Sequence, residues 1–235
     1  MLLVEEAGDP SVAPGEPPER ALRFTGLMLV LLVALALPLV WWLEAVVFDV
    51  ARPPRSPIDS EPLLRALQAI ADRVSLLALT GYVLWRQGRL RTLALTARGS
   101  DLLVGAALAA LGLVPFVVVG QLYFGGFGSW VVGPLTLERI TALELARVAS
   151  LAAVTTLVFR AYLITEIDAL TGNAPLAVVA SIAAEELSQF HFSVPGTLRL
   201  LIYTLFYWKT RRATPLLVAV VLASLWVLLH HAPAS

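Results

Sequence analysis

The sequence has no cysteine, and its three histidines are His191, His230 and His231. Disulfides, thiolate nucleophiles, cysteine-ligated zinc and iron–sulfur clusters are therefore excluded. No His-Glu-x-x-His sequence occurs, which excludes a zincin-type metalloprotease. Lys209 is the single lysine, and no Walker A or dinucleotide-binding motif is present, so P-loop and Schiff-base chemistry are not expected.

Charge is also scarce. Charged residues make up 14% of the 235 residues, and the 17 basic residues balance the 17 acidic ones. This balance predicts no cationic surface for nucleic acid. Hydrophobic residues reach 58% and the mean hydropathy is +0.81, whereas soluble domains are about 45–50% apolar and about 25% charged. The composition predicts an integral membrane protein that has the lipid bilayer as its main surroundings.

Long apolar runs, separated by charges, proline and glycine, predict an all-α, polytopic transmembrane helical bundle with about seven spans in residues 21–235. Residues 1–20 are acidic and rich in proline, and we expect them to form a disordered cytoplasmic tail. The segment 124–134 is expected to be an interfacial or re-entrant loop. The expected spans are Thr25–Val47, Leu64–Trp85, Asp101–Tyr123, Leu143–Leu163, Pro175–Phe192, Thr197–Trp208 and Pro215–His231.

The positions of the basic residues predict the orientation of these spans. If spans alternate, one side of the membrane holds more basic residues than the other, and the richer side is expected to be cytoplasmic. The N-terminus is then cytoplasmic and the C-terminus extracytoplasmic, in the cell (inner) membrane of a bacterium. The richer side holds Arg20, Arg23, the four arginines of 86–98 that follow the second span, Lys209, Arg211 and Arg212; the other side holds Arg52, Arg55, Arg139 and Arg199.

Ionisable residues inside predicted spans are candidate functional residues, because they are costly in lipid. Glu144 and Arg147 are three apart and are expected to form a structural ion pair. Arg160 is expected to make a buried or interfacial structural contact, with Glu185, Glu186 or Glu166 as partner. At about 100° per residue, Thr156 and Arg160 share a helix face.

The segment AEELSQFHF, which contains Glu185, Glu186 and His191, is the most polar stretch within the spans. Glu185 shares a helix face with Gln189, but Glu186 and His191 point in different directions. One helix therefore cannot present both glutamates and the histidine to a metal. These side chains either bind neighbouring helices as polar contacts or form a site with groups from other spans.

His191, His230 and His231 are predicted to lie at the same outer interface. Neutral imidazoles there could bind a metal or the central metal of a tetrapyrrole. The alternative is a solvated histidine pair at the end of the last helix. A pigment- or haem-associated membrane subunit is therefore one functional hypothesis, and the absorbance spectrum of the purified protein would test it.

The second half of the chain resembles the CPBP family of CAAX-protease and bacteriocin-processing (Abi-like) membrane proteins. The resemblance covers a core of about 143–235 and is carried by the order and spacing of three segments. Arg160 and His191 match motif residues of the family. The segments are TTLVFRAYL (Thr155–Leu163), GNAPLAVVASIAAEELSQFHF (Gly172–Phe192) and PGTLRLLIYTLFYWKTRRATPLLVAV (Pro195–Val220).

The resemblance implies a CPBP-like fold, but several residues of the family's peptidase site are replaced. Thr155 and Thr156 stand where the family has paired glutamates, and the last helix lacks the expected histidine and asparagine. Threonine cannot act as a general base near neutral pH, so peptide hydrolysis of the family kind is not expected. The leading hypothesis is a structural or regulatory subunit of a membrane complex, which requires no cofactor. The alternative is an active intramembrane peptidase whose site has moved to Glu185, Glu186 and a histidine, with Arg160.

Overall fold

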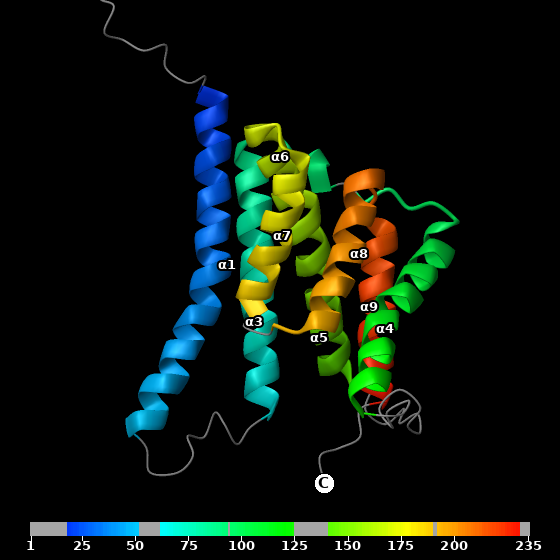
Figure 1. Cartoon of the computed structure of the whole chain (residues 1–235). Coiled ribbons are helices and arrows are strands. Elements are labelled where there is room, and N and C mark those ends of the chain that lie inside the picture. Colours follow the sequence, from blue (N-terminus) through cyan, green and yellow to red (C-terminus); the bar gives the residue numbers. More distant parts are fainter. Residues whose placement is uncertain (1–17, 52–61, 94, 125–140, 190–191, 231–235) are drawn as a thin grey trace, which may run out of the picture.

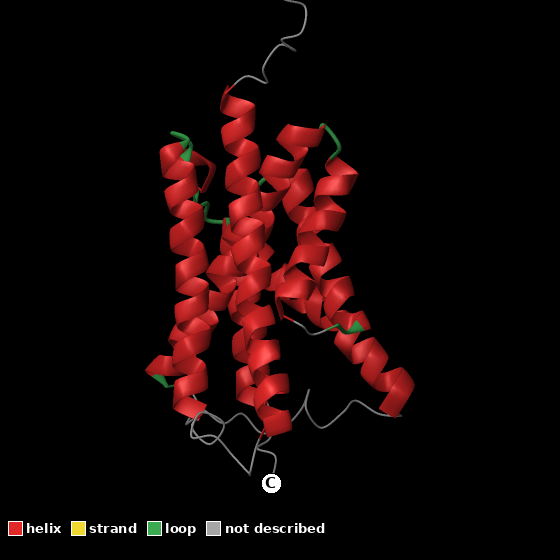
Figure 2. Cartoon of the chain, turned by 90° about the vertical axis from the view of Figure 1, so that its left-hand side faces the viewer, coloured by secondary structure: helices red, strands yellow, loops and turns green. Residues whose placement is uncertain are grey.

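The computed structural model describes residues 18–51, 62–93, 95–124, 141–189 and 192–230, and its regular elements in these ranges are all helical (Figures 1 and 2). The predicted all-α class is therefore confirmed. Helix α1 begins at Pro18, inside the segment 1–20 for which disorder is expected; residues 1–17 and the loop segment 125–134 lie outside the described residues. The elements are α1 (Pro18–Ala51), α3 (Pro62–Arg86), the 3₁₀ turn η1 (Leu90–Leu93), α4 (Asp101–Phe124), α5 (Ala142–Ala153), the π-helix η3 (Val154–Ile164), α6 (Thr165–Thr171), α7 (Ala174–Gln189), α8 (Val194–Thr210) and α9 (Thr214–His230).

Elements α5, η3 and α6 follow one another without a break and form one central helix. It starts after Thr141, whose hydroxyl accepts a hydrogen bond from the backbone N–H of Glu144 at 3.2 Å. It ends at Gly172, which adopts a left-handed φ of 64° and donates its N–H to the carbonyl of Asp168 at 2.8 Å. These are ordinary N-cap and C-cap arrangements, so local sequence defines both ends of the central helix.

The other helices surround the central helix. Helices α3, α7, α8 and α9 pack against it, α1 contacts α3, α7 and the α6 end of the central helix, and α4 lies outside α8 and α9. Successive long helices run in opposite directions (Figure 1). All residues of η3 except Leu157 are buried, so partners for its polar groups must come from within the protein.

Four helical stretches in the described part of the chain are long and apolar enough to cross a membrane: Glu19–Val40, Ala66–Arg86, Asp101–Val119 and Ala142–Thr171. Thr214–Leu229 in α9 is apolar but shorter. Helices α7 and α8 have 16 and 17 residues, fewer than the roughly 20 needed to cross the hydrocarbon core without distortion. The structure is thus compatible with a helical membrane protein, and four of the seven predicted spans meet the length and hydropathy expected of a full crossing.

Basic side chains gather at the end of the bundle where α1, α4 and α9 begin and α3, α6 and α8 end, which we call the arginine-rich end (top of Figure 1). Each described acidic residue there is held by an arginine: Glu19 by Arg23 at 2.7 Å, Glu166 by Arg89 at 2.5 Å, Asp168 by Arg211 at 2.6 Å, and Asp101 by Arg212. The basic residues of this end are Arg20, Arg23, Arg86, Arg89, Arg91, Arg98, Lys209, Arg211 and Arg212.

Glycine permits the close contact between α4 and α9. A Cβ atom on Gly105 would lie 2.5 Å from Cγ1 of Val218 and 2.8 Å from the backbone oxygen of Pro215. The carbonyl of Pro215 cannot move without shifting α9. Small residues at helix contacts are a common means of association between membrane helices, because they let the backbones approach closely.

We predict that Gly105→Ala lowers the thermal stability of the detergent-solubilised protein, by about 1–3 kcal/mol, because the added methyl group overpacks the α4–α9 contact. Gly81→Ala in α3 is the matched control, since nothing lies within 4 Å of its added Cβ. The control should gain up to about 1 kcal/mol from the better helix propensity of alanine. Equal stabilisation by both substitutions would contradict the close contact.

Candidate functional site

The candidate site is built around Arg160, on the π-helical part of the central helix. The run from Val154 to Val158 includes four β-branched residues, which are weak α-helix formers because their side chains crowd the preceding turn. A π-helix is defined by hydrogen bonds between backbone groups five residues apart. The Nη1 atom of Arg160 donates a hydrogen bond to the carbonyl oxygen of Thr155, five residues earlier.

Thr156 and Arg160, which are predicted to share a helix face, are both buried in this π-helical segment. Thr155 Oγ1 donates to the carbonyl of Leu151 at 2.9 Å, as threonine commonly does in membrane helices. Thr156 Oγ1 is buried and has no hydrogen-bond partner among the described residues. Thr155 lines the interior cavity described below, while the hydroxyl of Thr156 is not paired with Arg160.

Glu185 on α7 is the partner of Arg160. Nη1 of Arg160 lies 2.7 Å from Oε2 of Glu185, and both side chains are 1% exposed. One turn earlier on α7, Ser181 Oγ donates to the carbonyl of Phe159 at 2.5 Å. Two polar contacts therefore fix α7 against η3, and the predicted structural contact of Arg160 with one of the three glutamates is confirmed for Glu185.

The two other glutamates considered as partners of Arg160 bind elsewhere. Oε1 of Glu186 accepts a hydrogen bond from Thr197 Oγ1 on α8 at 2.7 Å, which links α7 to α8. Glu166 on α6 is fully buried and pairs with Arg89. The predicted ion pair between Glu144 and Arg147 is also confirmed, at 2.8 Å. The polar residues of α7 thus contact neighbouring helices on different sides.

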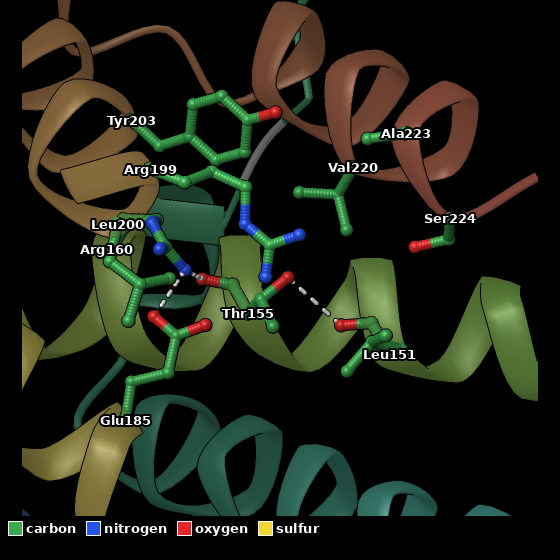
Figure 3. Close-up of a pocket in the computed structure, with 10 residues that line it drawn as sticks. All are labelled: Leu151, Thr155, Arg160, Glu185, Arg199, Leu200, Tyr203, Val220, Ala223 and Ser224. Carbon is green, nitrogen blue, oxygen red and sulfur yellow. Dashed lines mark hydrogen bonds and ion pairs between the residues drawn. The ribbon is translucent and has the colours of Figure 1, made fainter. Parts of the chain in front are cut away.

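Helices α8 and α9 complete the site (Figure 3). Arg199 on α8 points toward the region of Arg160 and Glu185, and its guanidinium carbon lies 5.3 Å from the centre of the Phe116 ring. These groups enclose a cavity of about 50 Å³. It is lined by Leu151, Thr155, Arg160, Glu185, Arg199, Leu200, Tyr203, Val220, Ala223 and Ser224.

Arg199, Tyr203 and Ser224 were not identified from the sequence. Arg199 was counted only as a basic residue of the extracytoplasmic side, and the structure places it inside α8, where it lines the cavity. Its position two residues into the predicted span Thr197–Trp208 was the available signal, because an arginine within a span is a functional candidate. Tyrosine and serine are common in membrane helices, so Tyr203 and Ser224 carried no such signal.

The cavity is polar and has room for a few water molecules. Nε and Nη2 of Arg160 and the hydroxyl of Tyr203 are buried with no hydrogen-bond partner in the described part of the chain. Buried water occupies polar cavities where it can make two to four hydrogen bonds, and each molecule needs about 10–15 Å³. The site can therefore hold water next to a guanidinium–carboxylate pair, and its volume lies well below the roughly 300–1,000 Å³ of typical ligand pockets.

The side chains of the three histidines lie outside the described part of the chain. His191 and His231 are not among the described residues, and the side chain of His230 is not described either. Across the described residues, no group of three His, Asp or Glu side chains is placed to hold a metal ion. The predicted histidine site therefore stays a prediction.

Comparisons of the chain with protein-family models, curated proteins and solved structures gave no match.

We predict that Glu185→Gln lowers the stability of the protein by about 3–5 kcal/mol, because it leaves a buried guanidinium without its counter-charge. The double variant Arg160→Met/Glu185→Leu should recover most of this loss, since an apolar pair of similar volume needs no desolvated charge. Thermal unfolding in detergent measures both effects.

The exposed ion pair between Glu144 and Arg147 provides the control. Arg147→Met should change stability by less than about 1 kcal/mol, because solvent screens this pair. If Glu185→Gln proves as harmless as Arg147→Met, the buried pair does not hold α7 to the central helix.

Proposed function

We propose that the chain is a CPBP-like integral membrane protein without peptidase activity, which acts as a structural or regulatory subunit of a membrane complex. The observation that carries the proposal is that the carboxylate of Glu185 is paired with the guanidinium of Arg160, beside a cavity of about 50 Å³. Hydrolysis needs a carboxylate or a metal that is free to activate water beside a bound peptide. Here the carboxylate is already paired and the cavity is too small for a peptide segment.

The family assignment is supported by Arg160. It matches the arginine of the family's first motif, and it lies on the central helix, which contacts α7 and α8. The family's paired glutamates correspond to Thr155 and Thr156, whose hydroxyls supply no basic group. A CPBP-like fold that keeps the arginine as a structural residue fits this pattern.

We further propose that seven helices lie within the bilayer: α1, α3, α4, the central helix, α7, α8 and α9. Helices α7 and α8 form a shorter hairpin. The arginine-rich end faces the cytoplasm. The excess of basic residues at that end supports this orientation. The N-terminus is then cytoplasmic and the C-terminus extracytoplasmic.

Reporter fusions test this topology. Fusions made after Arg98 and after Arg212 are both expected to report a cytoplasmic location, because both residues lie at the arginine-rich end. A fusion after Ala51, where α1 ends at the opposite end of the bundle, is the control and should report an extracytoplasmic location. An extracytoplasmic signal after Arg98 or Arg212 would reject the orientation.

Peptidase assays test the proposed loss of activity. The purified chain is expected to cleave neither prenylated nor leader-peptide substrates, since Glu185 is bound by Arg160. An active CPBP protease assayed on the same substrates shows that the conditions support cleavage. Cleavage by the native chain that disappears in Glu185→Gln, Glu186→Gln or His191→Ala would overturn the proposal.

The same assay evaluates a second candidate function, an intramembrane peptidase with a relocated site. One observation favours it: Glu185 shares its cavity with the side chains of Thr155, Tyr203 and Ser224, so a carboxylate and hydroxyl groups meet at one place. Its activity would require Arg160 to release Glu185. The subunit proposal instead expects purification in mild detergent to recover a membrane-protein partner in a fixed ratio, and a monodisperse chain without a partner would count against it.

A further inference from the structure

Among the described residues, the arginine-rich end carries more basic than acidic side chains. Each described acid at this end is already paired with an arginine. Arg86, Arg91 and Lys209 are exposed, and no ion-pair partner for them lies within the described ranges. Basic residues at the end of membrane helices attract anionic lipid, with about 1 kcal/mol for each residue near the surface.

One of these cations, Arg91, borders an open recess of about 680 Å³ between η1, α6 and α8. Arg211 lies on the other side of the recess, where α8 ends. Its backbone has a left-handed φ of 52°, and its guanidinium is held by Asp168 at 2.6 Å. Asp168 thus fixes the position of Arg211, whose five N–H groups exceed what one carboxylate oxygen accepts.

Hydroxyl groups add further hydrogen-bonding capacity to this recess. Thr96, Thr165 and Tyr207 line it together with the two arginines. Two guanidinium groups and one carboxylate give the lining a net positive charge. Arginine matches the oxygens of a phosphate through paired N–H groups, and neighbouring hydroxyls can bind the remaining oxygens.

Two exposed tryptophans near the recess favour a position at the depth of lipid headgroups. Trp85 near the end of α3 and Trp208 near the end of α8 are 60% and 40% exposed at the same end of the bundle. Exposed tryptophans mark the membrane–water interface in helical membrane proteins. A phosphate of the headgroup layer would then lie within reach of the recess.

We propose that this recess binds the phosphate of an anionic phospholipid, with Arg91 as its main cationic ligand and Arg211 as the second. The inference is independent of the proposed subunit function and of the interior cavity. A free phosphate ion has the same oxygen chemistry, so the test separates the two sources.

The test measures binding of phosphatidylglycerol to the full chain in detergent by native mass spectrometry. Phosphatidylcholine and inorganic phosphate are assayed in parallel. The native chain should bind phosphatidylglycerol more tightly than phosphatidylcholine, and Arg91→Gln should weaken that binding about tenfold through loss of a charge-assisted contact. Arg91→Lys, which keeps the charge, should recover part of it.

Arg86→Gln is the matched control, because Arg86 is an exposed cation of the same end that does not line the recess. It should change the affinity by no more than about twofold, since only the diffuse attraction to the surface is lost. Equal weakening by Arg86→Gln and Arg91→Gln would overturn the proposal and indicate a non-specific charge effect. Binding of inorganic phosphate as tight as that of phosphatidylglycerol would overturn the lipid source.

Discussion

The ion pair between Arg160 and Glu185 is the interaction on which the rest of the structure depends. Both groups are removed from solvent in the middle of the bundle. Separating a buried pair leaves an uncompensated charge, which costs several kcal/mol. The helices that carry the two residues must therefore stay in contact, and η3 and α7 are further joined by Ser181 and the carbonyl of Phe159. The pair sets the position of α7 relative to the central helix.

The pair also makes the centre of this bundle polar. Arg199 and Tyr203 from α8 approach the same point, and Ser224 from α9 completes the lining. Four helices thus line a cavity that has room for a few water molecules. Such a polar centre can specify one arrangement of helices, because Arg160 and Glu185 pair only in that arrangement. The arginine-rich end differs, since its cations exceed the described acids.

Much of the fold and part of the candidate site could be predicted from the sequence. Composition predicted a helical membrane protein, and the high cost of charge in lipid identified Arg160 and Glu185 as residues that need partners. The three-residue spacing of Glu144 and Arg147 predicted their contact. The π-helix could not be predicted, because periodicity arguments assume about 100° per residue, and within it Arg160 bonds to the carbonyl of Thr155. Arg199 lay inside the predicted span Thr197–Trp208 but was counted only as a basic residue of one side, so its place at the cavity was missed.

A structure of the purified chain in lipid nanodiscs, at a resolution that places side chains, tests the central claim most directly. The account predicts a direct contact between the guanidinium of Arg160 and the carboxylate of Glu185, in an interior cavity of water-molecule dimensions. Separated Arg160 and Glu185 side chains, or a cleft that opens Glu185 to a peptide-sized ligand, would contradict it.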